Sequence, residues 1–151
     1  MKPRAPRPPI GWREWVGLPD LGVAWVKAKV DTGARSSSLH VWDIDIADVA
    51  GLVRFNAHPV QDDDTTVMSC TAELIEQREV RSSNGEAELR PVVRTSALLA
   101  GGLYEIELTL SRRDEMGFRM LLGRSAIKRR FVVDPARSFL GGGDKNAPPQ
   151  G

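Results

Sequence analysis

The sequence of 151 residues predicts an all-β fold, a closed or strongly curved antiparallel barrel with one short helix. Three observations support this. Apolar residues alternate with polar ones at a period of two over most of the chain, which is typical of strands with one buried face. Ser83-Asn84-Gly85 gives a hairpin turn signal between two such runs, and only Arg124 to Arg130 has a helical pattern. Many short strands with little helix favour a curved or closed sheet.

The strands follow from this alternation in chain order. Residues 23–30 place Ala24, Val26, Ala28 and Val30 on one face, with Trp25, Lys27 and Lys29 on the other. The cleanest alternation is in residues 103–110, where Tyr104, Ile106, Leu108 and Leu110 share a face. Weaker patterns predict further strands at residues 39–46, 52–60, 71–80, 88–95, 118–122 and 131–133.

Length and composition predict one domain, residues 10–140, between a Pro/Arg-rich tail (1–9) and a Gly/Pro-rich tail (141–151) that we expect to be disordered. Hydrophobic residues make up 41% of the chain and the net charge is +1, so we expect no membrane and no direct nucleic-acid partner. The single cysteine, Cys70, excludes an internal disulfide, and we expect it to be a small buried side chain. The first residues have no apolar core of a secretory signal, so the cytoplasm is the expected compartment.

Two motifs carry chemistry. The strand at residues 23–30 ends in Asp31-Thr32-Gly33, which delivers a carboxylate into a turn where it is difficult to solvate. Gly33 frees the backbone and keeps the approach to the carboxylate open, and the Thr32 hydroxyl can help to lock the turn. The second motif runs from Met120 to Ile127 as an apolar strand, a glycine and a short helix. The alternative interpretation of Asp31 is a carboxylate that only caps its turn.

From Ile10 through Leu140 the chain resembles the RimB-like family of small retropepsin-like peptidases, often labelled ATP-dependent zinc proteases. The resemblance rests on five blocks in order: Gly11 to Trp15, Lys27 to Ala34, Val80 to Gly85, Gly117 to Arg124 and Asp134 to Ser138. It implies a retropepsin-like barrel, a single lobe that forms a homodimer, and peptidase activity. It further implies the trimming of a polyglutamate tail on a small-subunit ribosomal protein that an ATP-grasp glutamate ligase modifies.

The resemblance also implies roles for single residues. One lobe supplies one catalytic Asp31, so two copies must meet across a two-fold axis to form the pair that aspartic proteolysis needs. Two adjacent carboxylates share one proton, so one acts as a base on water and the other as an acid. Thr32 would hydrogen-bond across the dimer. Four residues would support the site, with Arg124 bracing the dimer near the catalytic turn: Leu121, Leu122, Gly123 and Arg124.

The predicted substrate is an acidic peptide. Arg35 stands where viral retropepsins often carry an acidic residue, and its guanidinium is suited to carboxylates. Arg81, Arg90 and Arg94 lie on or behind the hairpin that we interpret as a flap. The alternative is that these arginines pair with surface carboxylates. The expected substrate-binding residues are Ala34, Arg35, Arg81, Ser82, Ser83, Asn84 and Gly85.

No cofactor is expected. His40, His58 and Cys70 do not form a zinc motif, and no glycine-rich segment is followed by the Lys-Ser/Thr of a phosphate-binding loop. Two alternatives to a peptidase remain open: a non-catalytic module that recruits or regulates a glutamate ligase, and a zinc-dependent hydrolase. Other residues receive structural or surface interpretations: Trp12, Trp15 and Trp25 as packing, Asp62 to Asp64 as a solvated loop, and Lys128 to Arg130 as a charged helix end.

Overall fold

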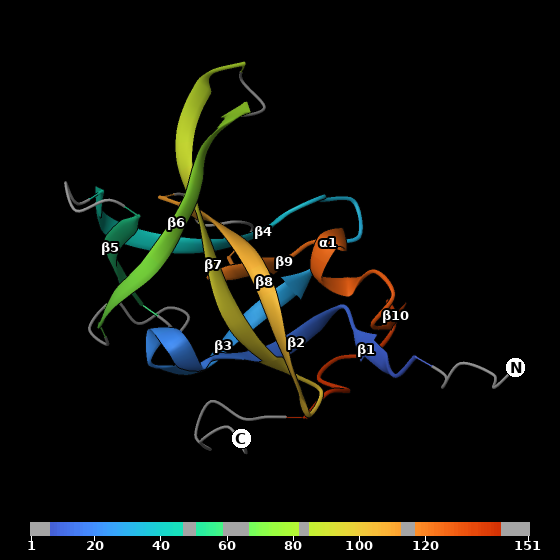
Figure 1. Cartoon of the computed structure of the whole chain (residues 1–151). Coiled ribbons are helices and arrows are strands. Elements are labelled where there is room, and N and C mark those ends of the chain that lie inside the picture. Colours follow the sequence, from blue (N-terminus) through green and yellow to red (C-terminus); the bar gives the residue numbers. More distant parts are fainter. Residues whose placement is uncertain (1–6, 47–50, 59–66, 82–84, 113–116, 143–151) are drawn as a thin grey trace, which may run out of the picture.

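The computed structural model describes residues 7–46, 51–58, 67–81, 85–112 and 117–142 (Figure 1). Within them the elements run in chain order as β1 (Pro9–Gly11), β2 (Arg13–Leu18), the 3-10 turn η1 (Pro19–Leu21), β3 (Val23–Val30), β4 (Ser37–Ile46), β5 (Leu52–Ala57), β6 (Met68–Arg81), β7 (Ala87–Leu99), β8 (Gly102–Ser111), β9 (Met120–Leu122), α1 (Arg124–Ile127) and β10 (Val132–Asp134). The all-β prediction is confirmed, and each predicted strand is present to within a few residues. Pro59 and Val60 of the predicted 52–60 strand lie outside the described residues.

One sheet contains eight of these strands in the order β2-β3-β9-β4-β5-β6-β7-β8, and further pairings of β2 with β7 and of β4 with β8 curl it back on itself. Most neighbours are antiparallel, as predicted. Two pairings are parallel, β3 with β9 and β4 with β8, and the alternation pattern did not reveal them. β1 and β10 form a separate parallel pair that joins the two ends of the described chain.

The core fills the interior of this curled sheet with aliphatic side chains. In β8, Ile106, Leu108 and Leu110 are buried, as the alternation predicts. In β3 the prediction is wrong at one position, since Ala24 is exposed and Val23 is buried instead. The cause is an irregularity in the pairing of β2 with β3 between Val16 and Leu18, which shifts the inward face by one residue at the start of β3.

The helix is shorter than predicted. α1 ends at Ile127, three residues before the expected end at Arg130. The backbone of Lys128 turns extended (ψ 129°) and that of Arg129 is left-handed (φ 69°), so the helical hydrogen bonds cannot continue. The chain thereby carries Arg130 out of the helix direction and turns toward β10.

The ends of the expected domain lie slightly further out than predicted. Pro9, assigned to the N-terminal tail, begins β1, and Val132 N donates to Pro8 O (3.2 Å). Gly141, assigned to the C-terminal tail, donates its N–H to Glu14 Oε1 (2.8 Å). Among the described residues no helix is long and apolar enough to cross a membrane.

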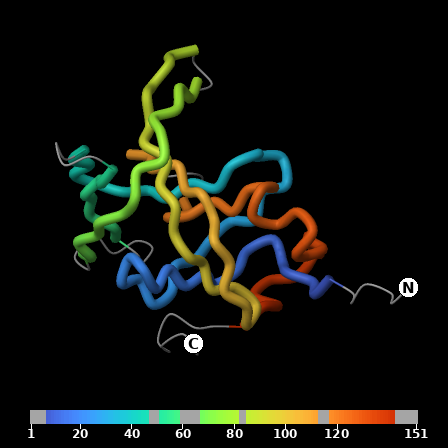
Figure 2. The backbone as a smooth tube through the Cα atoms, viewed as in Figure 1, coloured from blue at the N-terminus to red at the C-terminus, as the bar shows by residue number. Residues whose placement is uncertain are grey.

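The β6–β7 hairpin is the most prominent departure from a compact outline. Its strands pair antiparallel from Glu73 opposite Arg94 to Arg81 opposite Ala87. Their inner halves belong to the curled sheet, whereas their outer halves extend well beyond it, as the green and yellow arms in Figures 1 and 2 show. The hairpin therefore has a buried base and a solvated arm.

Candidate active site

We call residues 31–34 the catalytic turn, after the role that the sequence predicts for Asp31; the turn begins where β3 ends beside β9. Val30 pairs with Leu122 in the parallel ladder, and Asp31 N donates to Leu122 O (2.9 Å). Gly33 N then donates to Asp31 Oδ1 (2.9 Å), and Ala34 N donates to Asp31 O (3.2 Å). These three bonds fix both the backbone and the carboxylate of Asp31.

The turn is more open than the sequence predicted. Asp31 is only half-buried, and Thr32 and Gly33 are exposed. The Thr32 hydroxyl bonds to no described residue of its own chain, so it does not lock the turn. That role falls to the Gly33 N–H, since a backbone donor to a carboxylate two residues earlier is the bond that closes an Asx turn.

β9 and the start of α1 hold the turn from the other side. Arg124 N donates to Ala34 O (2.8 Å), and Ser125 N donates to Arg35 O (3.0 Å). Gly123 N donates to Ser37 Oγ (3.0 Å), which satisfies a buried N–H. A Cβ on Gly123 would stand 2.4 Å from Ser36 O, so only glycine permits this close approach.

The Arg124 side chain completes the support. Its Nη1 donates to Thr32 O (3.1 Å) and to Gly33 O (3.0 Å), the two carbonyls at the exposed tip of the turn. The structure thus brings together Asp31, Thr32 and Gly33 with the four residues expected to support them: Leu121, Leu122, Gly123 and Arg124. Their contacts to the turn come from main-chain atoms and one guanidinium.

A cleft of about 350 Å³ opens at the turn, and Asp31, Ala34, Arg35, Leu121 and Arg90 are among the residues that line it. Arg90 is 8% exposed. Its Nε has no hydrogen-bond partner in the described chain, although a carboxylate oxygen of Glu88 lies 3.6 Å away. A buried guanidinium with an unused donor beside a carboxylate-bearing cleft is a strong attractor for an anionic ligand.

The hairpin that the sequence predicts as a flap is present as β6–β7, although Ser82, Ser83 and Asn84 lie outside the described residues. Arg81 is exposed, lies 3.8 Å from a Glu79 oxygen, and does not line the cleft. Gly85 is exposed with a left-handed backbone (φ 85°), as a turn glycine requires. Val80, next to Arg81, does face the cleft.

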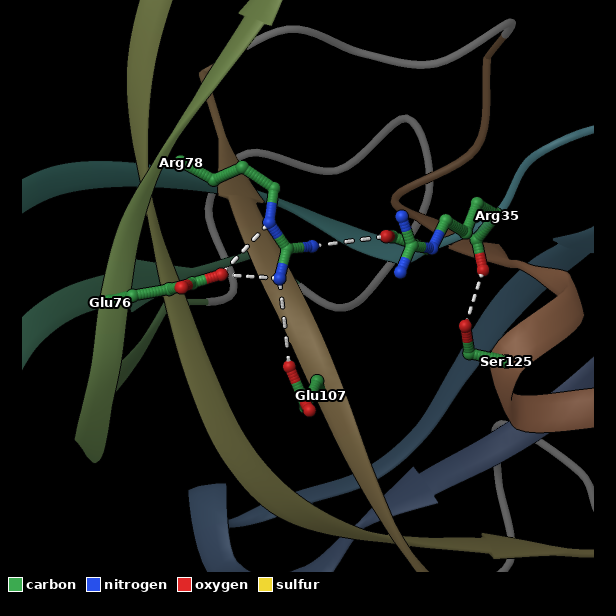
Figure 3. Close-up of polar contacts among 6 residues, drawn as sticks. Arg35, Glu76, Arg78, Glu107 and Ser125 are labelled. Carbon is green, nitrogen blue, oxygen red and sulfur yellow. Dashed lines mark hydrogen bonds and ion pairs between the residues drawn. The ribbon is translucent and has the colours of Figure 1, made fainter.

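Sequence reasoning missed Arg78, which connects the hairpin to Ser36, just after the catalytic turn (Figure 3). Its Nη1 donates to Ser36 Oγ (3.2 Å), its Nε donates to Glu76 Oε1 (3.0 Å), and its Nη2 lies 3.8 Å from Glu107 Oε1. The alternation in β6 could have indicated that Arg78 faces the cleft, because Arg78 is two residues from Val80 and therefore lies on the same face of the strand. The sequence predicts substrate contacts in the hairpin only for Arg81, near its turn, and for Arg90 and Arg94 in β7.

Sequence reasoning also missed Glu14, a fully buried carboxylate. Glu14 Oε2 accepts from Gly11 N (2.6 Å) and Leu140 N (2.8 Å), and its Oε1 accepts from Gly141 N (2.8 Å). Three backbone donors compensate for the loss of water around the charge. The carboxylate therefore fastens the end of the described chain to the strands behind the catalytic turn.

Backbone hydrogen bonds connect the segments that Glu14 holds together to the residue directly before Asp31. Trp12 O accepts from Val30 N (2.8 Å), directly before Asp31, and Trp12 N donates to Arg137 O (2.9 Å). A Cβ on Gly11 would stand 2.2 Å from Arg137 O, so the two segments touch through main-chain atoms. The Gly11-to-Trp15 and Asp134-to-Ser138 blocks therefore meet behind the catalytic strand. Trp15 packs there against Phe139 (ring centroids 5.3 Å apart), the packing role expected for it.

The described residues do not fit a zinc ion. His40 stacks on Trp42 and His58 packs against it at a tilt, with ring centroids 4.1 and 3.9 Å away, and Cys70 lies elsewhere, donating to Leu21 O (3.3 Å). Burial raises the pKa of the Cys70 thiol to about 11, which disfavours the thiolate that binds metals. Across the described ranges, no group of three His, Cys, Asp or Glu side chains could hold a metal ion.

Comparison with known proteins agrees with this geometry. A family model described as "RimB-like: Retropepsin-like aspartic endopeptidase RimB" matches residues 9–142. A crystal structure of a Legionella pneumophila protein of unknown function superposes with a TM-score of 0.73 at 29% identity, over 89% of this chain and 98% of that one.

Curated relatives are larger proteins. Those from Shewanella pealeana and Desulfotalea psychrophila, each named "Probable alpha-L-glutamate ligase", are 44% and 45% identical over 132 and 129 residues. The matches cover 86% and 84% of this chain but 29% and 28% of those proteins, so the chain spans less than a third of their length. The family match covers nearly the whole chain, and the chain therefore belongs to the RimB-like family of retropepsin-like aspartic endopeptidases.

Proposed function

We propose that the protein is a homodimeric aspartic endopeptidase that hydrolyses peptide bonds in acidic, polyglutamate-type tails. The observation that supports this most directly is the position of Asp31. Its carboxylate stands at the end of β3, fixed by Gly33 N, and lines a cleft open to a peptide. Backbone bonds from β9 and α1 surround the turn, which is the preorganisation that catalysis by a carboxylate requires.

The chemistry needs a second carboxylate, and a second copy supplies it. Asp31 is half-buried and Thr32 and Gly33 are exposed, so the tip of the turn is accessible to a two-fold partner. Across that axis the two Asp31 side chains hold one proton between them. The ionised carboxylate takes a proton from water, the water oxygen attacks the scissile carbonyl, and the protonated carboxyl donates to the carbonyl oxygen. In the tetrahedral intermediate, the carboxyl that took the water proton donates it to the amide nitrogen, and the other carboxylate takes a proton from a hydroxyl of the intermediate. The C–N bond then breaks, which releases the amine and the new carboxylic acid.

The preference for acidic peptides is supported by charge in the cleft. Arg90 is buried there with an unused donor, and Arg35 lines the same space with an exposed guanidinium. The names of the larger relatives suggest where such peptides arise, since an alpha-L-glutamate ligase joins glutamates to an acceptor. We infer that an ATP-grasp ligase of this kind extends a tail on a small-subunit ribosomal protein in the cytoplasm. This chain then shortens the tail.

The test is mass spectrometry of a polyglutamate-tailed ribosomal protein after incubation with the wild-type chain or with Asp31→Asn, both without added metal. Asparagine retains an oxygen that can accept from Gly33 N, so the fold of the turn is kept while the catalytic proton chemistry is lost. We expect shortened tails with the wild type only, and a loss of more than about 10³-fold in the variant.

Two results would contradict the proposal. Equal shortening by both proteins would exclude Asp31 as the catalytic group. No shortening by a folded, dimeric wild type, together with tight binding of the tail, would instead identify a non-catalytic module that recruits or regulates the ligase. Sedimentation analysis of the same samples reports the dimer independently of cleavage.

A further inference from the structure

A second cavity lies beside the catalytic cleft. Arg35 and Ser36, which follow the catalytic turn, border it together with the β6–β7 hairpin, β8 and α1. Its volume is about 470 Å³. We call it the arginine pocket, because four arginines and two glutamates line it: Arg35, Arg78, Arg94, Arg130, Glu105 and Glu107. Arg35 and Arg78 also line the catalytic cleft, so the two cavities adjoin at these side chains.

The charges of the arginine pocket are only partly compensated. Arg94 Nε lies 2.9 Å from Glu105 Oε1, and its Nη1 lies 3.9 Å from Glu73 Oε1. Arg78 pairs with Glu76 and lies 3.8 Å from Glu107 Oε1 (Figure 3), so carboxylates from β6 and β8 compensate these two arginines. Arg35 and Arg130 have no ion pair with any described residue. Two guanidiniums therefore remain available, and each can hold a carboxylate through two parallel hydrogen bonds.

Both of these arginines are anchored. Ser125 donates to Arg35 O through its N (3.0 Å) and through its Oγ (2.7 Å), which fixes the backbone that presents the guanidinium (Figure 3). Arg130 lies over the Tyr104 ring (4.8 Å to the centroid), and its Nη1 donates to Ala126 O (3.4 Å). The early end of α1 carries Arg130 to this position, which explains why the helical prediction had left it on the surface.

We propose that the arginine pocket is a carboxylate subsite: Arg35 and Arg130 bind a carboxylate of an acidic peptide whose neighbouring residues lie in the catalytic cleft. This inference rests on the proposed function and extends it. Glu76 and Glu107 occupy Arg78, and Glu105 and Glu73 occupy Arg94, so these carboxylates oppose the ligand and limit the affinity of the subsite. The carboxylate comes either from a glutamate side chain within the peptide or from its C-terminal end.

The test measures binding of labelled hexaglutamate to the full chain carrying Asp31→Asn, with hexaglutamine as the uncharged comparison. We expect Arg130→Gln to weaken hexaglutamate binding by at least about tenfold, the effect of losing one charge-assisted contact. Glu107→Gln, which removes the opposing carboxylate, should tighten binding several-fold. Arg54→Gln is the matched control, because it removes one exposed arginine on β5 outside both cavities and should change binding less than twofold.

Damage to the fold would weaken hexaglutamate binding in both variants, so it cannot explain weaker binding by Arg130→Gln together with tighter binding by Glu107→Gln. Arg130→Gln binding like Arg54→Gln, or Glu107→Gln binding more weakly than its parent, would overturn the subsite. Hexaglutamate with an amidated end identifies the source of the carboxylate: unchanged binding assigns a side chain, and a loss as large as that of Arg130→Gln assigns the terminal carboxylate.

Kinetics separate this proposal from the proposed function. With Asp31 present, Arg130→Gln should raise KM for an acidic peptide while kcat stays near the wild-type value. If the wild type cuts no peptide but the binding pattern holds, the peptidase proposal fails and the subsite stands. If the wild type cuts and KM is unchanged in Arg130→Gln, the subsite fails and the peptidase stands.

Discussion

The catalytic turn and the arginine pocket adjoin, yet different interactions hold them. The turn is fixed by main-chain hydrogen bonds of 2.8 to 3.2 Å and by the close approach of Gly123 to Ser36. The pocket is arranged by long charged side chains, several of them largely exposed, such as Glu105 with 66% of its side chain accessible. Backbone contacts lose little entropy when they form in a folded sheet, whereas exposed ion pairs contribute little stability.

This difference suggests that the turn serves precise positioning and the pocket serves charge recognition. A carboxylate pair across a two-fold axis tolerates little displacement, because misplacement by about 1 Å can cost about 10²-fold in rate. Selection of an acidic peptide tolerates more, since a guanidinium on a long side chain can follow its ligand. Under the proposed function, the reactive group stands at a strand end and the charge recognition rests on side chains that can move.

The largest effect should follow from disturbing the backbone at the turn. In Gly123→Ala the new Cβ would stand 2.4 Å from Ser36 O, and neither backbone segment can move without breaking the bonds around Asp31. We expect destabilisation of about 3 kcal/mol and about 100-fold lower kcat. Chemical denaturation and peptide-cleavage assays measure the two quantities.

Ala126→Gly is a control for Gly123→Ala, since it changes one methyl group three residues away in α1. It should cost about 1 kcal/mol of stability and leave the catalytic turn in place, so kcat should stay near that of the wild type. Wild-type activity in a stably folded Gly123→Ala protein would mean that the backbone approach is not required.

Behind the turn, at the carboxylate of Glu14, we expect a similar loss of stability but a smaller effect on kcat. Glu14→Ala would leave the N–H groups of Gly11, Leu140 and Gly141 without their acceptors, which should cost on the order of 3 kcal/mol of stability. Glu14→Gln retains one acceptor oxygen and should lose about half as much. Thermal unfolding of the two variants measures the order, and a fully stable Glu14→Ala would show that this clamp does not secure the base of the turn.

The sequence predicted the elements of the turn better than their connections. Alternation identified β3 and β8, and the Asp-Thr-Gly and Leu-Leu-Gly motifs identified which residues meet. The parallel pairing of β3 with β9 was not predictable in the same way, because a period of two is identical in parallel and antiparallel strands. The shifted face at Ala24 depends on a register irregularity between β2 and β3, where three steps along β3 (Val26 to Val23) match two along β2 (Val16 to Leu18), and this cannot be read from alternation alone.

The pocket was less predictable than the turn, for a physical reason. Arg130 reaches it only because Lys128 and Arg129 leave the helical conformation, and Arg78 joins it only because β6 passes beside Ser36. Glu14 carried a sequence signal in a family block, but a carboxylate bound by backbone donors 126 and 127 residues away is a tertiary feature. Local patterns identify charged residues, whereas their partners depend on topology.

The smallest effect on stability should come from the hairpin, and its size tests the contrast between the two regions. Glu76 accepts from Arg78, with 48% and 39% of the two side chains exposed. Glu76→Gln should therefore change the free energy of unfolding by less than about 0.5 kcal/mol, as is typical of exposed ion pairs. It should nevertheless alter acidic-peptide binding, because Arg78 borders both cavities and loses a competing carboxylate. Denaturation together with peptide titration checks both statements. A loss of stability comparable to that of Glu14→Gln would mean that side-chain charges hold the hairpin as firmly as backbone bonds hold the turn.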